Sequence, residues 1–285
     1  MNSEQVYCSV CGERRLDPSD RTVAALTKTF LASVTDLDSR VYRTLRTLIT
    51  APGMLSSAFA RGQRKPFLGP VQLFILANVV YFLLQPFAAH SGYNTPLEFQ
   101  LDRQAYSRTL PVAEWVAESR QVTGRSEDVF AAVYNNQSEV LAKSLVFLMV
   151  PMFALLMSAL MAGTGRLTAD HVVFALHYYA FELLVMHSLF MMIWPRLVLA
   201  VGGPLIDSLD ADQAANAVRS TMHVLLEFAG PILVLGPYLY FSTLRFYETS
   251  RWRAAVTAAI ALLCLIGIAV VYRVILLIAT LFTIN

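Results

Sequence analysis

The most constraining feature of this sequence is a long apolar stretch that directly follows a cluster of basic residues. The cluster contains Arg61, Arg64 and Lys65, and only uncharged residues occupy positions 70–89. About twenty apolar residues in a helix cross the ~30 Å hydrocarbon core of a bilayer. Basic residues beside such a helix favour the cytoplasmic side. The stretch therefore predicts a membrane-spanning helix, and we interpret the basic cluster as an orientation signal that also contacts phospholipid head groups.

The composition extends this prediction to the rest of the chain. Hydrophobic residues make up 56% of the sequence and charged residues 15%, against roughly 45–50% and about 25% in soluble domains. The apolar residues gather in five blocks of spanning length, which predicts an all-α, polytopic bundle over residues 70–285. The predicted spans are Pro70–Ala89, Ser144–Gly163, Val172–Ile193, Thr221–Phe241 and Ala254–Ile284.

The charges between these blocks alternate in sign. Segment 1–69 holds ten Lys or Arg against six acidic residues, whereas segment 90–143 holds five against seven. Segment 207–220 is acidic and 242–253 is basic. The positive-inside rule then predicts a cytoplasmic N-terminus and an extracytoplasmic C-terminus. The net charge is only +2 and the basic residues form no single patch, so we expect no nucleic-acid partner.

Segment 1–69 is predicted to be a cytoplasmic head. Its Cys8-Ser-Val-Cys11-Gly turn could supply two thiolates to zinc, but a structural zinc site takes four ligands. Zinc would therefore need ligands from a second chain, and two free thiols are the alternative. No other cofactor is expected.

Amphipathic helices follow the cysteines. One carries apolar residues from Val23 to Val34. A second, starting at Asp38 and ending before Pro52-Gly53, carries apolar residues at every third or fourth position. Its Arg side chains suit an interfacial helix that reaches lipid phosphates, and packing on the membrane domain is the alternative.

Segment 90–143 is the longest connection, and we predict a small helical extracytoplasmic cap there. Pro111 suits the first turn of one helix, and Ser126-Glu127-Asp128 suits the start of another.

Ionisable residues inside the predicted spans are the candidate functional groups, because they are costly in lipid and often functional. We expect them to form a polar cluster in the outer half of the bundle, and we expect an Arg273–Glu227 pair. His177, Glu182 and His187 are spaced by five, which at 100° per residue turns successive side chains by about 140°, so they should not all share one face. The predicted cluster comprises Glu182, His187, His223, Glu227 and Arg273.

The order of motifs in residues 7–85 resembles a known bacterial membrane-protein family, domain of unknown function 3667. The residues that carry the resemblance are the Cys8–Gly12 turn, Thr44-Leu45, Pro52-Gly53 and the run from Arg61 to Pro70. The resemblance implies a multi-pass protein of the bacterial inner membrane, of unassigned activity.

Together these features predict a non-enzymatic accessory or scaffold protein that acts through protein partners, a second copy of itself or lipid head groups. The alternative is a small transporter or lipid-handling permease that uses the intramembrane Glu, His and Arg residues. No nucleophile–base motif of a hydrolase is present in the sequence.

Overall fold

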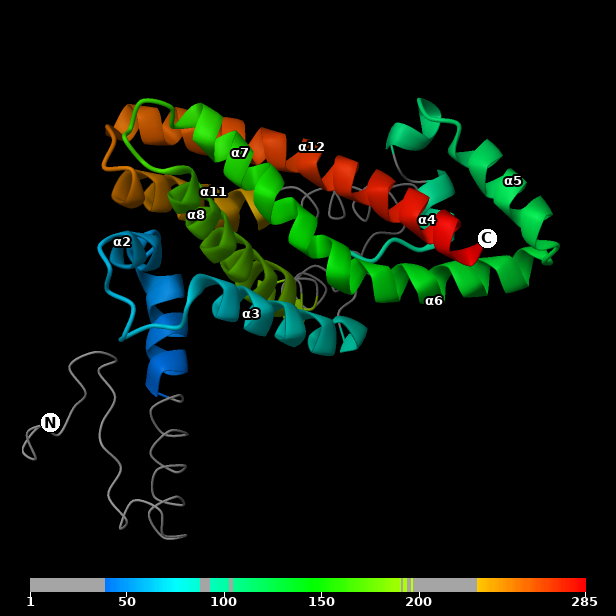
Figure 1. The fold of residues 1–285 in the computed structure, drawn as a ribbon, viewed down its shortest axis with the longest axis horizontal. Coiled ribbons are helices and arrows are strands. Elements are labelled where there is room, and N and C mark those ends of the chain that lie inside the picture. Colours follow the sequence, from blue (N-terminus) through cyan, green and yellow to red (C-terminus); the bar gives the residue numbers. More distant parts are fainter. Residues whose placement is uncertain (1–38, 88–92, 103–104, 191, 194–195, 197–229) are drawn as a thin grey trace, which may run out of the picture.

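The computed structural model describes residues 39–87, 93–102, 105–190, 192–193, 196 and 230–285, and every regular element among them is a helix. This confirms the all-helical fold. A helix over 39–50 comes first. The α-helices labelled in Figure 1 follow: α2 (Met54–Ala60), α3 (Pro70–Leu84), α4 (Leu97–Asp102), α5 (Val112–Thr123), α6 (Glu127–Leu145), α7 (Met149–Leu160), α8 (Thr168–Phe181), α11 (Gly230–Phe246) and α12 (Arg251–Ile284). Between them lie the short 3-10 helices η2 (Gln85–Phe87), η3 (Ala105–Arg108) and η4 (Val146–Leu148), and the π-helical η5 (Glu182–Phe190).

Three helices of the described chain are long and apolar enough to cross a membrane: Glu127–Leu160, Thr168–Phe190 and Arg251–Ile284. They correspond to the second, third and fifth predicted spans. The first and fourth correspond to shorter apolar helices, Pro70–Leu84 and Ile232–Phe246, and part of the fourth lies outside the described residues. The structure thus supports a membrane protein, and the number of five spans stays a prediction.

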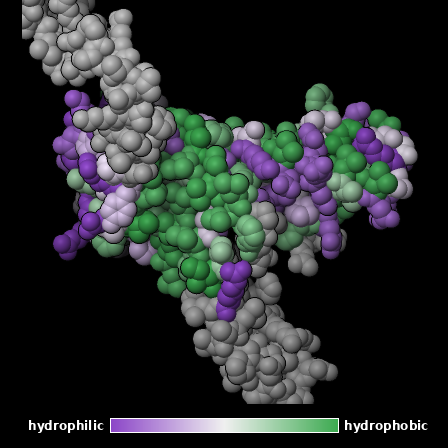
Figure 2. Space-filling model, turned by 90° about the horizontal axis from the view of Figure 1, so that it is seen from below, coloured by the Kyte–Doolittle hydropathy of each residue, from purple (hydrophilic) through white to green (hydrophobic). Residues whose placement is uncertain are grey.

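The outer faces of these helices are apolar. On α3 a stripe with four-residue spacing is about half exposed or more, and it consists of Val71 (54%), Ile75 (46%), Val79 (51%) and Leu83 (66%). Residues four apart lie on one face of a helix. Figure 2 shows hydrophobic side chains gathered over the middle of the molecule, with hydrophilic ones to either side. A continuous exposed apolar surface is unusual for a soluble monomer and is what contact with lipid requires.

Two helical rods extend beyond the rest of the bundle. The run α6–η4–α7 covers 34 residues, as does α12, so each is about 50 Å long at 1.5 Å per residue. Figure 1 shows α6 and the end of α12 extending together toward α5, away from α2 and α8. We expected the helix after Ser126 to be separate from the span at Ser144, but no Pro or Gly lies between residues 127 and 150, and η4 only tightens one turn.

The protruding ends enclose a second, smaller core with α4 and α5, which we call the cap. Tyr106 in the cap donates its hydroxyl to Gln100, and burial raises the pKa of Tyr106 to about 12, so the phenol stays neutral. The buried residues of this core are Leu97, Tyr106, Val112, Val116, Phe130, Tyr134, Leu277, Leu281 and Ile284.

The loops that the charge pattern assigns to the cytoplasmic side lie together at the other end. Arg245 Nη1 donates to Pro52 O at 2.7 Å, and Arg253 Nη2 donates to Ala162 O at 2.9 Å. Both bonds satisfy carbonyls near helix ends, which a helix leaves without partners. At the cap end, Arg125 Nη1 donates to the carbonyl of Ile284 at 3.2 Å, next to the C-terminus.

The helix over 39–50 packs its apolar side on the bundle. Leu48 is buried, and Val41 and Leu45 pack against the same core. Of the two alternatives for this amphipathic helix, the structure therefore favours packing on the membrane domain. The following turn needs glycine at position 53, because its φ is +78° and a Cβ there would lie 2.6 Å from the carbonyl oxygen of Ser242 on α11.

Candidate functional site

A hollow of about 250 Å³ lies where the helix over 39–50, α2 and the loop before α3 meet α8. We call it the basic pocket. Two arginines from different elements face it, and aromatic and amide side chains complete the wall. The lining residues are Arg40, Leu55, Phe59, Gln63, Arg64, Phe67, Leu68, Gly69, Gln72 and His177.

Local hydrogen bonds fix the shape of this pocket. Arg40 Nη2 donates to Phe67 O at 2.7 Å, and the Leu68 amide donates to Thr44 Oγ1 at 2.9 Å. The Gly69 amide donates to Gln72 Oε1 at 3.1 Å, just before Pro70 opens α3. These bonds hold the loop against the helix over 39–50.

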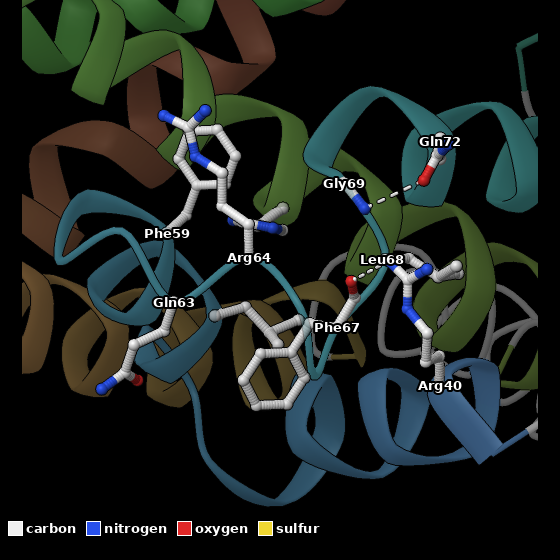
Figure 3. Close-up of a pocket in the computed structure, with 10 residues that line it drawn as sticks. Arg40, Phe59, Gln63, Arg64, Phe67, Leu68, Gly69 and Gln72 are labelled. Carbon is white, nitrogen blue, oxygen red and sulfur yellow. Dashed lines mark hydrogen bonds between the residues drawn. The ribbon is translucent and has the colours of Figure 1, made fainter. Parts of the chain in front are cut away.

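The N–H groups of the two arginines are not all used in hydrogen bonds within the pocket wall. Arg40 Nε is buried and has no hydrogen-bond partner. The guanidinium of Arg64 lies over the Phe59 ring at 4.7 Å from its centroid, which leaves its N–H groups at the edge of the stack. Figure 3 shows Arg64 on Phe59 at one side and Arg40 at the other, with Phe67 and Leu68 between them. An arginine presents several donors in a fixed plane and suits phosphate or carboxylate.

Of the predicted basic cluster, Arg64 lines the pocket, whereas Arg61 and Lys65 do not. Arg40 was predicted only as part of an amphipathic helix. Its contribution depends on how that helix packs on the loop before α3, and spacing alone could not reveal this.

His177 closes the pocket from α8. It is buried, and its Nδ1 lies 2.9 Å from Ser56 Oγ on α2. We expected that His177, Glu182 and His187 would not all share one face, and His177 accordingly faces α2 and the basic pocket.

A second hollow of about 130 Å³ lies inside the bundle, and we call it the polar cavity. It brings together three of the predicted cluster residues, Glu182, His187 and Arg273. Four tyrosines and an apolar remainder complete the wall: Tyr93, Met149, Tyr178, Tyr179, Leu235, Leu265, Ala269 and Tyr272.

Glu182 and His187 form a close pair. Glu182 is 6% exposed, and its Oε1 lies 2.9 Å from His187 Nδ1, although the two are not aligned for a regular hydrogen bond. The expectation of a 140° separation is wrong for this pair, because residues 182–190 are π-helical. In a π-helix the backbone hydrogen bonds join residues five apart, so residues with this spacing lie on the same face.

Tyr93 holds the ring of His187 from outside the helix. The two rings stack with centroids 4.9 Å apart, and the Tyr93 amide donates to the Tyr81 hydroxyl at 2.9 Å. Burial, and after it the negative charge of Glu182, raise the pKa of Tyr93 well above its ordinary value, so the phenol remains neutral.

The remaining predicted residues Cys8, Cys11, His223 and Glu227 lie outside the described residues. Zinc at the cysteines and the Arg273–Glu227 pair therefore stay predictions. Within the described part of the chain, no group of three or more His, Cys, Asp or Glu residues is placed to hold a metal ion.

The family model described as protein of unknown function (DUF3667) matches residues 38–82. This confirms the resemblance over that segment, which runs from the helix over 39–50 into α3. Every residue that lines the basic pocket except His177 falls within the match. No curated protein and no solved structure matches the chain.

Proposed function

We propose that this chain is a non-enzymatic accessory protein of the bacterial inner membrane that binds the phosphate of an anionic phospholipid in the basic pocket. The observation that carries the proposal is that Arg40 and Arg64, from two different elements, line opposite sides of one pocket at the start of α3. Basic pockets beside membrane helices on the cytoplasmic side are typical sites for anionic lipid head groups.

The position of the pocket relative to the apolar stripe of α3 supports a lipid rather than a soluble anion. Gln72 lines the pocket and is exposed, and Ile75 lies three residues further on the same face. From Val71 to Leu83 the stripe rises by about 18 Å at 1.5 Å per residue, somewhat more than half of the ~30 Å hydrocarbon core. A lipid with its phosphate in the pocket can thus lay its acyl chains along α3.

The volumes of the two hollows bear on the alternative of a permease. About 130 Å³ in the polar cavity leaves room for several water molecules and not for a metabolite. The basic pocket is about twice as large and faces the surface beside an apolar stripe. Lipid head-group binding is therefore better supported than transport of an organic solute.

The test is a thermal-stability titration of the purified chain in neutral detergent. Short-chain phosphatidylglycerol should raise the melting temperature, because a ligand that binds only the folded state stabilises it. Phosphatidylcholine should raise it less, and inorganic phosphate should not reproduce the effect at equal concentration.

Charge-removing variants locate the binding. Arg64→Gln should abolish the shift without loss of basal stability, because Arg64 is exposed. Arg40→Gln should abolish it too, whereas Arg43→Gln, on the same helix but exposed and outside the pocket, should retain it. An undiminished shift in the Arg40→Gln/Arg64→Gln double variant would refute the proposal.

A further inference from the structure

The polar cavity contains a carboxylate that the fold leaves incompletely satisfied. Glu182 is 6% exposed, and its Oε2 has no hydrogen-bond partner. The hydroxyl of Tyr179, which lines the same cavity, is also buried without a partner. Buried polar atoms are nearly always hydrogen-bonded, so each such atom in a hollow of suitable size indicates a bound species.

The charged and titratable groups around Glu182 and His187 come from four parts of the described chain. Its own helical run contributes Tyr178, Tyr179 and His187, the segment before α4 contributes Tyr93, and α12 contributes Tyr272 and Arg273. From α7 and α11 the cavity receives only apolar groups, Met149 and Leu235. Tyr81 of α3 meets the edge of the His187 ring at a centroid distance of 5.7 Å.

The size and chemistry of the cavity select a very small ligand. A polar space of about 130 Å³ holds several water molecules, whose O–H groups can donate to Glu182 Oε2. A metal cation would find one carboxylate and one imidazole, which are too few for the usual coordination by three or more protein ligands. A proton needs only one of the two bases, and these lie 2.9 Å apart.

The π-helical segment brings the side chains of Glu182 and His187 together. With α-helical geometry, residues five apart would be turned by about 140° from each other, and His187 would leave the cavity. Ser188 Oγ donates to the carbonyl of Leu183 at 2.8 Å, a contact that also spans five residues. Departures of this kind from α-helical geometry occur frequently at functional sites.

We infer that Glu182 and His187 form a proton-binding site in a hydrated cavity inside the helix bundle. The proton is exchanged with water in the cavity and is held by the carboxylate or by the imidazole, with Tyr93 fixing the imidazole ring. Arg273 balances the charge of the carboxylate when the proton leaves. Acidic and histidine side chains within membrane helices serve in this way in proton relays. The inference is independent of lipid binding at the basic pocket.

The test is infrared difference spectroscopy of the full chain in lipid nanodiscs between about pH 5 and pH 8, the range in which histidine-linked sites titrate. A protonated carboxyl group should give a pH-dependent C=O band. Glu182→Gln should abolish the band, whereas Glu139→Gln, whose carboxylate is exposed and pairs with Lys143, should leave it unchanged. His187→Gln should move the titration midpoint by about one pH unit or more.

Three outcomes would overturn the inference. One is the absence of any Glu182-dependent band across the pH range, and another is an unchanged midpoint in His187→Gln. The third is a midpoint that moves with sodium at constant ionic strength, which would mean that a metal cation competes for the site. If Glu182→Gln does not fold, Glu182→Asp keeps the carboxyl group and must displace the band, and a band that stays in place belongs to another residue.

Discussion

The basic pocket and the polar cavity are assembled from the chain in opposite ways. All residues of the basic pocket except His177 come from one segment of the sequence, and its arginines reach the molecular surface. The polar cavity takes its wall from five separate segments, and its carboxylate is buried. A change in the pocket can therefore remove binding and leave the fold intact, whereas a change in the cavity affects binding and folding together.

The largest loss of stability should come from breaking the buried Glu182–His187 pair in the polar cavity. His187→Leu leaves the Glu182 carboxylate without its partner 2.9 Å away, and removal of one partner from a buried pair costs about 3–5 kcal/mol. The measurement is the free energy of unfolding in mixed detergent micelles. The matched control is Lys143→Gln, which opens an exposed i,i+4 pair with Glu139 and should cost no more than ~0.5 kcal/mol. Equal costs would contradict the contrast between the two regions.

A smaller loss of stability is expected at the Gly53 turn, where the segment that forms the basic pocket contacts α11. Gly53→Ala places a Cβ 2.6 Å from the Ser242 carbonyl at a φ of +78°, so backbone strain and a clash should together cost about 3 kcal/mol.

Gly62→Ala is the comparison for Gly53→Ala, because Gly62 has a φ of +79° and no atom within 4 Å of the added Cβ. It should cost only ~1 kcal/mol. If chemical unfolding gives the two alanine variants the same stability, the contact of the Gly53 turn with α11 has no energetic role.

The smallest effect concerns the hydrogen bond that joins the pocket to α8. Ser56→Ala removes the partner of His177 and leaves a buried ring nitrogen unsatisfied, which should cost about 1–3 kcal/mol. The neighbouring Ser57 is equally buried, but its hydroxyl has no partner, so Ser57→Ala should change the unfolding free energy by less than ~0.5 kcal/mol. A loss of stability in Ser57→Ala as large as in Ser56→Ala would show that packing, and not the hydrogen bond, connects α2 to α8.

The sequence predicted best those features that depend on local composition. The three helices of membrane length follow from runs of apolar residues, and the helix over 39–50 follows from the spacing of Val41, Leu45 and Leu48. The first predicted span, Pro70–Ala89, corresponds to α3, which ends at Leu84, and to the 3-10 turn η2 that follows it, while positions 88–89 lie outside the described residues. Hydropathy indicates how many consecutive residues are apolar, but it does not indicate where the α-helical backbone ends.

Features that depend on tertiary contacts could be predicted only in part. The sequence predicted that Glu182, His187 and Arg273 converge, because depth in the membrane follows from residue number. It did not predict the π-helical segment, since the choice between i→i+4 and i→i+5 bonding there depends on neighbours such as Tyr93, which stacks on His187. Nor did it predict the role of Arg40, whose hydrogen bond to Phe67 O spans 27 residues.

The length of α12 has a mechanical consequence. This single helix presents Tyr272 and Arg273 to the polar cavity and, about one turn later, Leu277 to the core of the cap. An α-helix is stiff over so short a distance, so a tilt of α12 at the cap would also move Arg273 at the wall of the polar cavity. The cap and the cavity therefore share one continuous helix, through which a displacement of the cap would change the distance between Arg273 and Glu182.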